Sequence, residues 1–113
     1  MRAETYTVEA GMLVRSVMPK SGRAYKHACP LDTLEAVAHA IDAAGQDGIG
    51  LEALHKAIDR PWTQIAVALA FLHHRGCIEH GFHRRYKAMS GDVYLDALIE
   101  YHALREGEEQ AAG

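Results

Sequence analysis

The sequence predicts one small α+β domain that is mostly helical and carries two short β parts. Its length of 113 residues fits a single domain of common size. Hydrophobic residues make up 49% and charged residues 24%, the profile of an ordinary globular chain. Aromatic residues make up only 7%, so the core must be built mostly from aliphatic side chains and alanine, which suits packed helices. A chain of this size buries about two thirds of its unfolded surface without needing disulfides or metals.

The first 30 residues predict a β-hairpin arm packed on the core. Residues 5–8 and 12–18 are rich in β-branched and apolar side chains, as strands are. Residues 19–22, Pro-Lys-Ser-Gly, form a strong turn signal, because proline fixes φ and glycine permits unusual φ. Residues 23–27 are then expected to return as a partner strand.

The first helix is predicted from its cap and its apolar spacing. Asp32 is expected to cap it, and Glu35, three residues later, completes a capping box. Gly45 is expected to end the helix. The apolar stripe at helical spacing comprises Leu34, Val37, Ala38, Ile41 and Ala44.

Two further helices are predicted around a break at Pro61. A short helix spans about residues 51–58, and a longer one runs from about 61 to 75 and closes at Gly76. Proline disfavours helix in the residue before it but is tolerated in the first turn of a new helix. The core stripe of the longer helix is Ile65, Ala68, Leu69 and Leu72.

A second hairpin and a last helix complete the prediction. Residues 77–80 and 84–88 are expected to pair as strands, and Ser90 or Asp92 is expected to cap a helix over about 93–106. Residues 107–113 are expected to fray. We therefore divide the single domain into an arm at 1–30, a core at 31–91, and a C-terminal helix with its tail at 92–113.

Charge is unevenly distributed although the net charge is only −3. Overall charge therefore gives no sign of nucleic-acid binding, which a basic patch usually signals. Residues 12–30 and 80–91 contain no acid, whereas residues 92–109 are strongly acidic. The cations of the two basic stretches are Arg15, Lys20, Arg23 and Lys26, and Arg84, Arg85 and Lys87. A near-neutral total thus conceals basic and acidic segments.

The order of elements over residues 31–88 resembles the winged helix-turn-helix superfamily. This order is helix, short helix, turn, helix and β-hairpin, and the match covers about half of the chain. The family pattern is carried by Ile49 before the second helix, Leu54 within it, Pro61 to Gln64 opening the third, the core positions Ile65, Leu69 and Leu72, and the closing Arg75-Gly76-Cys77-Ile78. The N-terminal arm is not a standard part of this family.

The resemblance implies a DNA-binding protein, and a transcriptional regulator in particular. In the family the third helix enters the major groove and the hairpin, or wing, touches flanking backbone or the minor groove. Carried over by position, the expected DNA contacts are Thr63, Gln64, Arg84, Arg85 and Lys87. The wing cations are suited to phosphates, and such contacts add salt-dependent affinity without recognising sequence. They could equally be a solvated hairpin face, since charged strands discourage edge-to-edge aggregation.

The third helix departs from the family, and this keeps a second function open. Its outward positions include Ala66, Val67, Ala70 and Phe71, whereas base edges are recognised by hydrogen-bonding side chains. A helix that is apolar nearly all round is usually buried, here under the arm, the last helix or a second copy. The alternative is therefore an interaction or homodimerisation module that does not bind DNA. The expected interface residues are Trp62, Val67, Phe71, Leu95 and Ile99.

No catalytic, metal or cofactor site is expected. The histidines and cysteines at 73, 74, 77, 80 and 83 invite a zinc interpretation, but His73 and His74 point about 100° apart on a helix. Cys77 also occupies an apolar strand position, and no nucleophile elbow or phosphate-binding glycine loop occurs. We therefore expect a protein without enzymatic activity. The chain has no apolar run that could span a membrane, so we expect a cytoplasmic protein with Cys29 and Cys77 as thiols.

Overall fold

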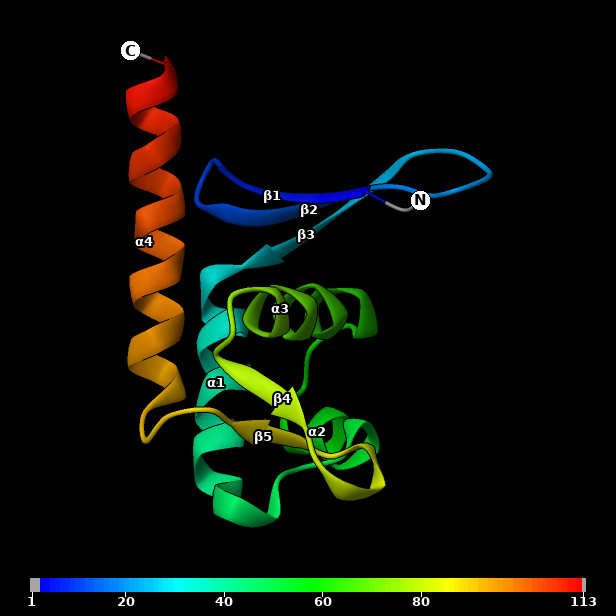
Figure 1. The fold of residues 1–113 in the computed structure, drawn as a ribbon, viewed down its shortest axis with the longest axis vertical. Helices are drawn as coiled ribbons and strands as arrows, with labels where there is room; N and C mark the ends of the chain where they lie inside the picture. Colours follow the sequence, from blue (N-terminus) through cyan, green and yellow to red (C-terminus); the bar gives the residue numbers. More distant parts are fainter. Residues whose placement is uncertain (1–2, 113) are drawn as a thin grey trace.

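The computed structural model describes residues 3–112, which form four α-helices, a three-stranded sheet and a two-stranded sheet. The predicted α+β class is confirmed. Figure 1 shows the three-stranded sheet lying across one end of the molecule, with α3 directly beneath it and the second sheet and α2 farther down. Helix α4 runs along one side of this stack.

The N-terminal sheet comprises β1 (Ala3–Glu9), β2 (Met12–Met18) and β3 (Tyr25–Pro30) in antiparallel order β1-β2-β3. All three segments predicted as strands, residues 5–8, 12–18 and 23–27, fall wholly or partly within these strands, but together they form a three-stranded sheet where a hairpin arm was expected. The turn between β1 and β2 consists of Ala10 and Gly11, both with positive φ. Two-residue hairpin turns require this conformation, since it matches the twist of the flanking strands.

Helix α1 (Leu31–Ala44) follows β3 without a loop. The predicted capping box is wrong: Pro30 is the N-cap, no side chain caps the helix, and Asp32 lies within the first turn. Glu35 instead accepts a hydrogen bond from the Tyr94 hydroxyl at 3.0 Å. The direct passage from strand to helix moves the cap position two residues earlier than the sequence pattern indicates. The helix ends at Gly45, which has φ +64, as predicted.

A 3-10 turn (Gly45–Asp47) leads to α2 (Leu51–Ala57) and α3 (Trp62–His74), close to the predicted bounds. Pro61 is the N-cap of α3, so the helix begins at Trp62, one residue after the predicted start. The predicted core stripe of α3 is buried, as is Leu54 of α2.

The second sheet is a short hairpin of β4 (Ile78–His80) and β5 (Tyr86–Ala88), joined by a 3-10 turn (Phe82–Arg84). We call this the β4–β5 hairpin. Ile49 extends it through two backbone hydrogen bonds with Tyr86, at 2.9 and 2.8 Å. Gly48 permits this approach, because a Cβ there would lie 2.8 Å from the Tyr86 carbonyl oxygen.

Helix α4 (Val93–Ala112) is capped twice at its start. Asp92, one of the two predicted caps, accepts a hydrogen bond from the Leu95 amide, and Asp42 of α1 accepts from the amides of Val93 and Tyr94. Farther along α4, the Tyr101 hydroxyl donates a hydrogen bond to the Gly11 carbonyl at 2.8 Å, which links the helix to the β1–β2 turn. The helix continues through residues 107–112, which were expected to fray, and Gly113 lies outside the described residues.

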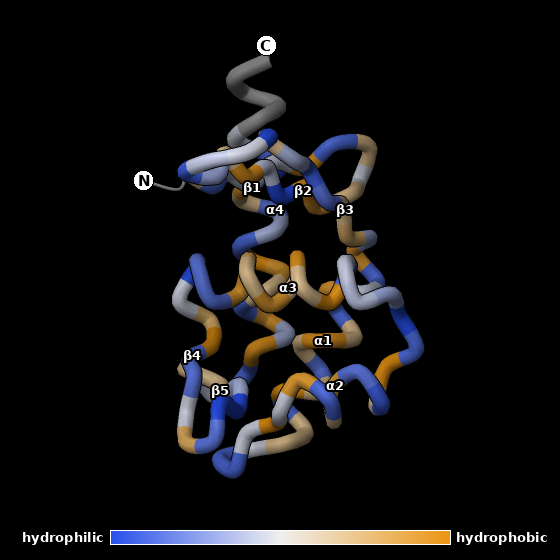
Figure 2. Tube along the Cα trace, turned by 90° about the vertical axis from the view of Figure 1, so that its right-hand side faces the viewer, coloured by the Kyte–Doolittle hydropathy of each residue, from blue (hydrophilic) through white to orange (hydrophobic). Residues whose placement is uncertain are grey.

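The N-terminal sheet covers one face of α3. The hydrophobic core is enclosed by this sheet, α3 and α1. Val67 and Phe71 of α3 are fully buried, and Tyr6 of β1 packs its ring edge-to-face on Phe71 with centroids 5.4 Å apart. The expectation that this apolar face is buried is confirmed for Val67 and Phe71, whose cover is the arm of the same chain, whereas Ala66 is exposed and Ala70 is half-buried. Figure 2 shows the apolar α3 lying between the sheet above it and α2 and the hairpin below.

Candidate nucleic-acid interface around α3 and the hairpin

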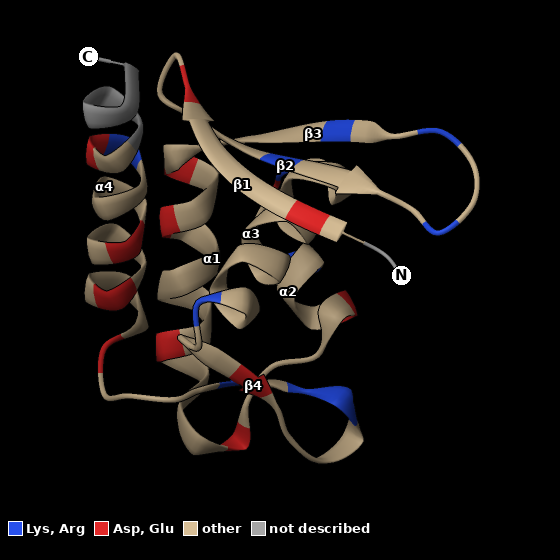
Figure 3. Ribbon diagram, turned by 45° about the horizontal axis from the view of Figure 1, so that its top comes forward, with Lys and Arg blue, Asp and Glu red and all other residues tan. Residues whose placement is uncertain are grey.

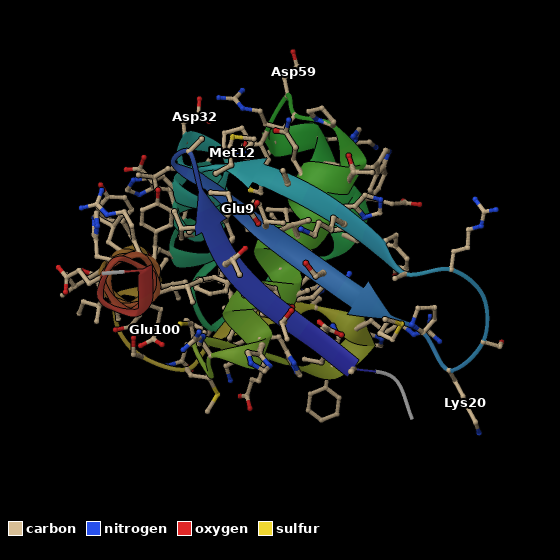
Figure 4. All side chains as sticks on the ribbon, turned by 90° about the horizontal axis from the view of Figure 1, so that it is seen from above. Glu9, Met12, Lys20, Asp32, Asp59 and Glu100 are labelled. Atoms are coloured by element: carbon tan, nitrogen blue, oxygen red, sulfur yellow. The ribbon has the colours of Figure 1, made fainter. Side chains whose placement is uncertain are left out.

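Charged residues are segregated on the molecule. Figure 3 shows Lys and Arg on β2, β3 and their connecting loop and again at the β4–β5 hairpin, whereas Asp and Glu lie mainly along α1 and α4, with others on β1 and β4. Figure 4 shows Lys20 pointing outward from the far end of the β2–β3 loop, opposite the side that carries Glu100. The fold thus turns the basic segments of the sequence to one side and the acidic helices to the other.

The tip of the β4–β5 hairpin exposes an aromatic ring beside cations. Phe82 is 91% exposed, the highest value among the large hydrophobic residues of the described chain. His83 and Arg84 both have φ +58, a left-handed conformation that side-chain-bearing residues seldom adopt. Such strain is typically maintained where a surface has a binding role. The geometry holds Phe82 and the exposed Arg84 outward rather than folding them onto the core.

The other two predicted hairpin contacts are less free than Arg84. The guanidinium of Arg85 donates to the Asp47 carbonyl at 3.4 Å, although its side chain remains exposed. Lys87 is half-buried and lies opposite Glu79 in the β4–β5 register, where opposite charges attract. Arg84 and Arg85 are therefore the cations of the hairpin that are best placed to meet an external anion.

The two predicted DNA contacts on α3 have different environments. Thr63 is exposed in the first turn of α3. The Gln64 side-chain oxygen, by contrast, accepts a hydrogen bond at 2.9 Å from the hydroxyl of Thr33, a fully buried residue of α1. Gln64 therefore satisfies a buried donor and links α1 to α3, so its side-chain oxygen is not free to accept a hydrogen bond from a base.

The predicted interface residues fall into two groups. Val67 and Phe71 are covered by the chain's own strands, so they offer no surface to a partner in this structure. Trp62, Leu95 and Ile99 are about half exposed, at 47%, 52% and 53% respectively. The Trp62 ring stacks on His55 of α2 at 4.0 Å, nearly parallel, which leaves its other face open.

An open groove of about 610 Å³ follows the uncovered side of α3. Trp62, Ala66 and Ala70 form its apolar floor together with Leu69 and with Leu51 of α2. The N-terminal sheet borders it with Glu4 and Arg15, and the hairpin borders it with His80 and Tyr86; His73 and His74 complete the lining. Sequence reasoning missed this groove, because its walls come from segments more than 60 residues apart.

The groove border on the sheet side is an ion pair. Arg15 donates from Nε to a Glu4 carboxylate oxygen at 3.0 Å, and the Tyr6 hydroxyl donates to the same oxygen at 2.6 Å. Burial, and then the hydrogen bond to Glu4, raise the pKa of the Tyr6 hydroxyl above its usual value. The Glu4 charge is thus compensated, and Glu4 is the single carboxylate among the residues that line this groove.

The cysteines and histidines show no reactive arrangement in the described part of the chain. Burial raises the pKa of Cys29 to about 12 and that of Cys77 to about 11, so both remain protonated thiols near neutral pH. His73 and His80 approach with ring centroids 5.6 Å apart. Within the described residues, no three histidine, cysteine or acidic side chains come together as metal ligands would, and no helix is long and apolar enough to cross a membrane.

No protein-family model, curated protein sequence or solved structure matches this chain.

Proposed function

We propose that this protein binds DNA as a winged-helix protein whose main contact is the β4–β5 hairpin. The observation that carries the proposal is the hairpin tip, where Arg84 and Arg85 stand exposed beside the 91% exposed Phe82. Cations at such a tip are suited to phosphates or to the narrow minor groove, where negative potential is high. The acidic helix α4 lies on the side of the molecule away from the hairpin, so its carboxylates repel phosphates bound at the hairpin only weakly (Figure 3).

The order of elements supports the winged-helix assignment. Helices α1, α2 and α3 are followed by the hairpin, and Ile49 between α1 and α2 pairs with Tyr86 as a short third strand. The N-terminal sheet covers the face of α3 that carries Val67 and Phe71, so α3 offers little for hydrogen bonding to bases. We therefore expect affinity to come mostly from sugar–phosphate contacts and to vary little with DNA sequence.

A salt series of DNA binding tests the proposal. Fluorescence anisotropy of a labelled duplex is measured with the native chain and with Arg84→Ala/Arg85→Ala. Counterion release predicts a linear fall of log affinity with log salt, and the double variant should lose about two units of slope. Its affinity should also fall similarly for unrelated sequences.

Arg75→Ala/Arg105→Ala is the matched control, because it removes the same charge from the acidic side. Arg75 pairs with Glu100 at 3.5 Å, and Arg105 lies on α4. This control should keep nearly the native slope. Equal losses in both double variants would mean that only net charge matters, and absence of binding at low salt would reject the proposal.

A second candidate is self-association through α4, favoured by Leu95 and Ile99. These residues lie one turn apart on the helix and are about half exposed. A second copy related by two-fold symmetry would pack the same stripe against itself. Light scattering across a concentration series should then give a dimer that Leu95→Ser/Ile99→Ser converts to a monomer. A native monomer at all concentrations would exclude this candidate.

A further inference from the structure

We propose that the groove along α3 binds single-stranded nucleic acid, with a base stacked on Trp62 and the phosphates held by the cations that flank the groove. This inference rests on the proposed DNA-binding function and names the strand form that the α3 groove accepts. It follows from three independent features: the exposed aromatic rings, their neighbouring cations, and the chemistry of the groove floor.

Three exposed aromatic side chains lie on different elements, and one of them, Trp62, lines the groove itself. Trp62 forms part of the floor, Phe82 stands at the hairpin tip, and Tyr25 opens β3 with 38% of its surface exposed. Two of these rings contact histidines: Trp62 stacks nearly parallel on His55 at 4.0 Å, and Tyr25 lies tilted against His27 with ring centroids 5.0 Å apart. The stack on His55 supports one face of the Trp62 ring and leaves the other for a base, and base–aromatic stacking tolerates any base.

Cations border the groove at the hairpin, where Arg84 and Arg85 line a neighbouring hollow that also includes the groove residues His80 and Tyr86. Cations also accompany two of the three rings in the chain. Tyr25 lies between Arg23 and Lys26, and Phe82 precedes Arg84 and Arg85. Aromatic platforms alternating with cations are the usual surface for single strands, because bases stack while the backbone follows positive charge. Figure 2 faces this side of the molecule, with the β2–β3 arm above α3 and the hairpin below.

The groove floor favours unpaired bases over a duplex. Ala66 and Ala70 provide no hydrogen-bonding group, and Gln64 is already engaged by Thr33. A duplex presents its base edges, which require donors and acceptors. A single strand presents apolar base faces, for which small side chains and an indole are suited. The groove has a volume of about 610 Å³, and the N-terminal sheet and the hairpin border it on either side, so a flexible single strand can follow it more easily than a rigid double helix.

Trp62 is the single tryptophan of the sequence, so its fluorescence reports on this groove alone. The probe is an oligodeoxythymidine of about 15 nucleotides, which forms no duplex. Stacking should quench the emission, and a duplex of equal length should quench it much less. Oligouridine in a parallel titration distinguishes RNA from DNA as the preferred strand, and quenching by either supports the inference.

Two pairs of variants make the test specific. Ala66→Glu places a carboxylate in the groove at an exposed helical position, and Ala103→Glu makes the same change on α4 as its control. Phe82→Ser removes the hairpin ring, and Met89→Ser is a control at an exposed apolar residue that does not line the groove. Anisotropy of labelled oligodeoxythymidine should weaken about tenfold for Ala66→Glu and for Phe82→Ser and remain near native for both controls.

The outcomes separate this inference from the proposed function. Duplex binding that depends on Arg84 and Arg85, without quenching of Trp62 by the single strand, would overturn the inference and leave the proposed function standing. Failure of both duplex and single strand to bind would reject both. Quenching that Ala66→Glu does not weaken would also overturn it, because the strand would then lie outside the groove.

Discussion

The covering of α3 by the N-terminal sheet predicts a large loss of stability for Phe71→Ala. The Phe71 side chain is fully buried, contacts Tyr6 edge-to-face at 5.4 Å, and carries the Arg75 guanidinium 5.5 Å from its ring centroid. Truncation of a buried phenylalanine typically costs about 3–5 kcal/mol, from lost transfer free energy and from the cavity left behind. We expect about 4 kcal/mol, a large part of the stability of a domain of this size.

Urea unfolding followed by circular dichroism measures this loss. Val67→Ala, which removes two methyl groups from the same covered face, should cost about 2 kcal/mol and tests the idea in a variant that stays folded. Leu95→Ala is the control, since Leu95 is 52% exposed, and should cost about 0.5 kcal/mol. If Phe71→Ala and Val67→Ala cost no more than Leu95→Ala, the sheet does not cover α3 in solution and α3 is open to DNA.

Three further predictions concern the supports of the site. Gly48 has φ +72 and ψ 179, a conformation that is essentially restricted to glycine. Gly48→Ala should therefore lower the free energy of unfolding by about 3 kcal/mol and Tm by roughly 10 °C. The control Gly91→Ala, where a Cβ would meet no neighbouring atom, should lower Tm little. Asp42→Ala removes the acceptor for the amides of Val93 and Tyr94, so it should lower the free energy of unfolding by about 2 kcal/mol and speed hydrogen exchange at the start of α4. Asp42→Asn should keep part of this stability. Equal losses in the two variants would contradict the capping role of Asp42. Burial raises the pKa of Cys77 from 9.0 to about 11, so the unfolded thiol ionises first: its contribution to stability is full below pH 9 and declines as pH rises toward 11. Denaturation of native protein and Cys77→Ala at several pH values checks this, and parallel curves would refute it.

The elements that the sequence predicted well are those specified by local patterns. The stripe of α1 and its end at Gly45, the core positions of α3, and the Asp92 cap all depend on residues within one or two turns of each other. Helical periodicity and capping act over this range, so the sequence alone carries the signal. The capping box at Asp32 was wrong because β3 runs directly into α1, a junction that no local pattern indicates.

The candidate site was predicted only in part. The basic hairpin could be found from Arg84 and Arg85 in the sequence, and their exposure agrees with the pattern. Gln64 could not be assigned correctly, because its partner Thr33 is 31 residues away and belongs to another helix. The groove was missed for the same reason, since Glu4 and Arg15 reach it from the N-terminal sheet while Tyr86 reaches it from the hairpin.

The sequence by itself determined the α+β class, the approximate helices, and the separation of basic from acidic segments along the chain. The apolar character of α3 also required some cover, because exposed apolar surface is unfavourable in water. Only the tertiary structure decided that this cover is the chain's own N-terminal sheet, and which side of α3 remains open as a groove. Many covers satisfy the same hydrophobic demand, since the hydrophobic effect has no direction. The choice among them depends on how all the strands and helices pack together.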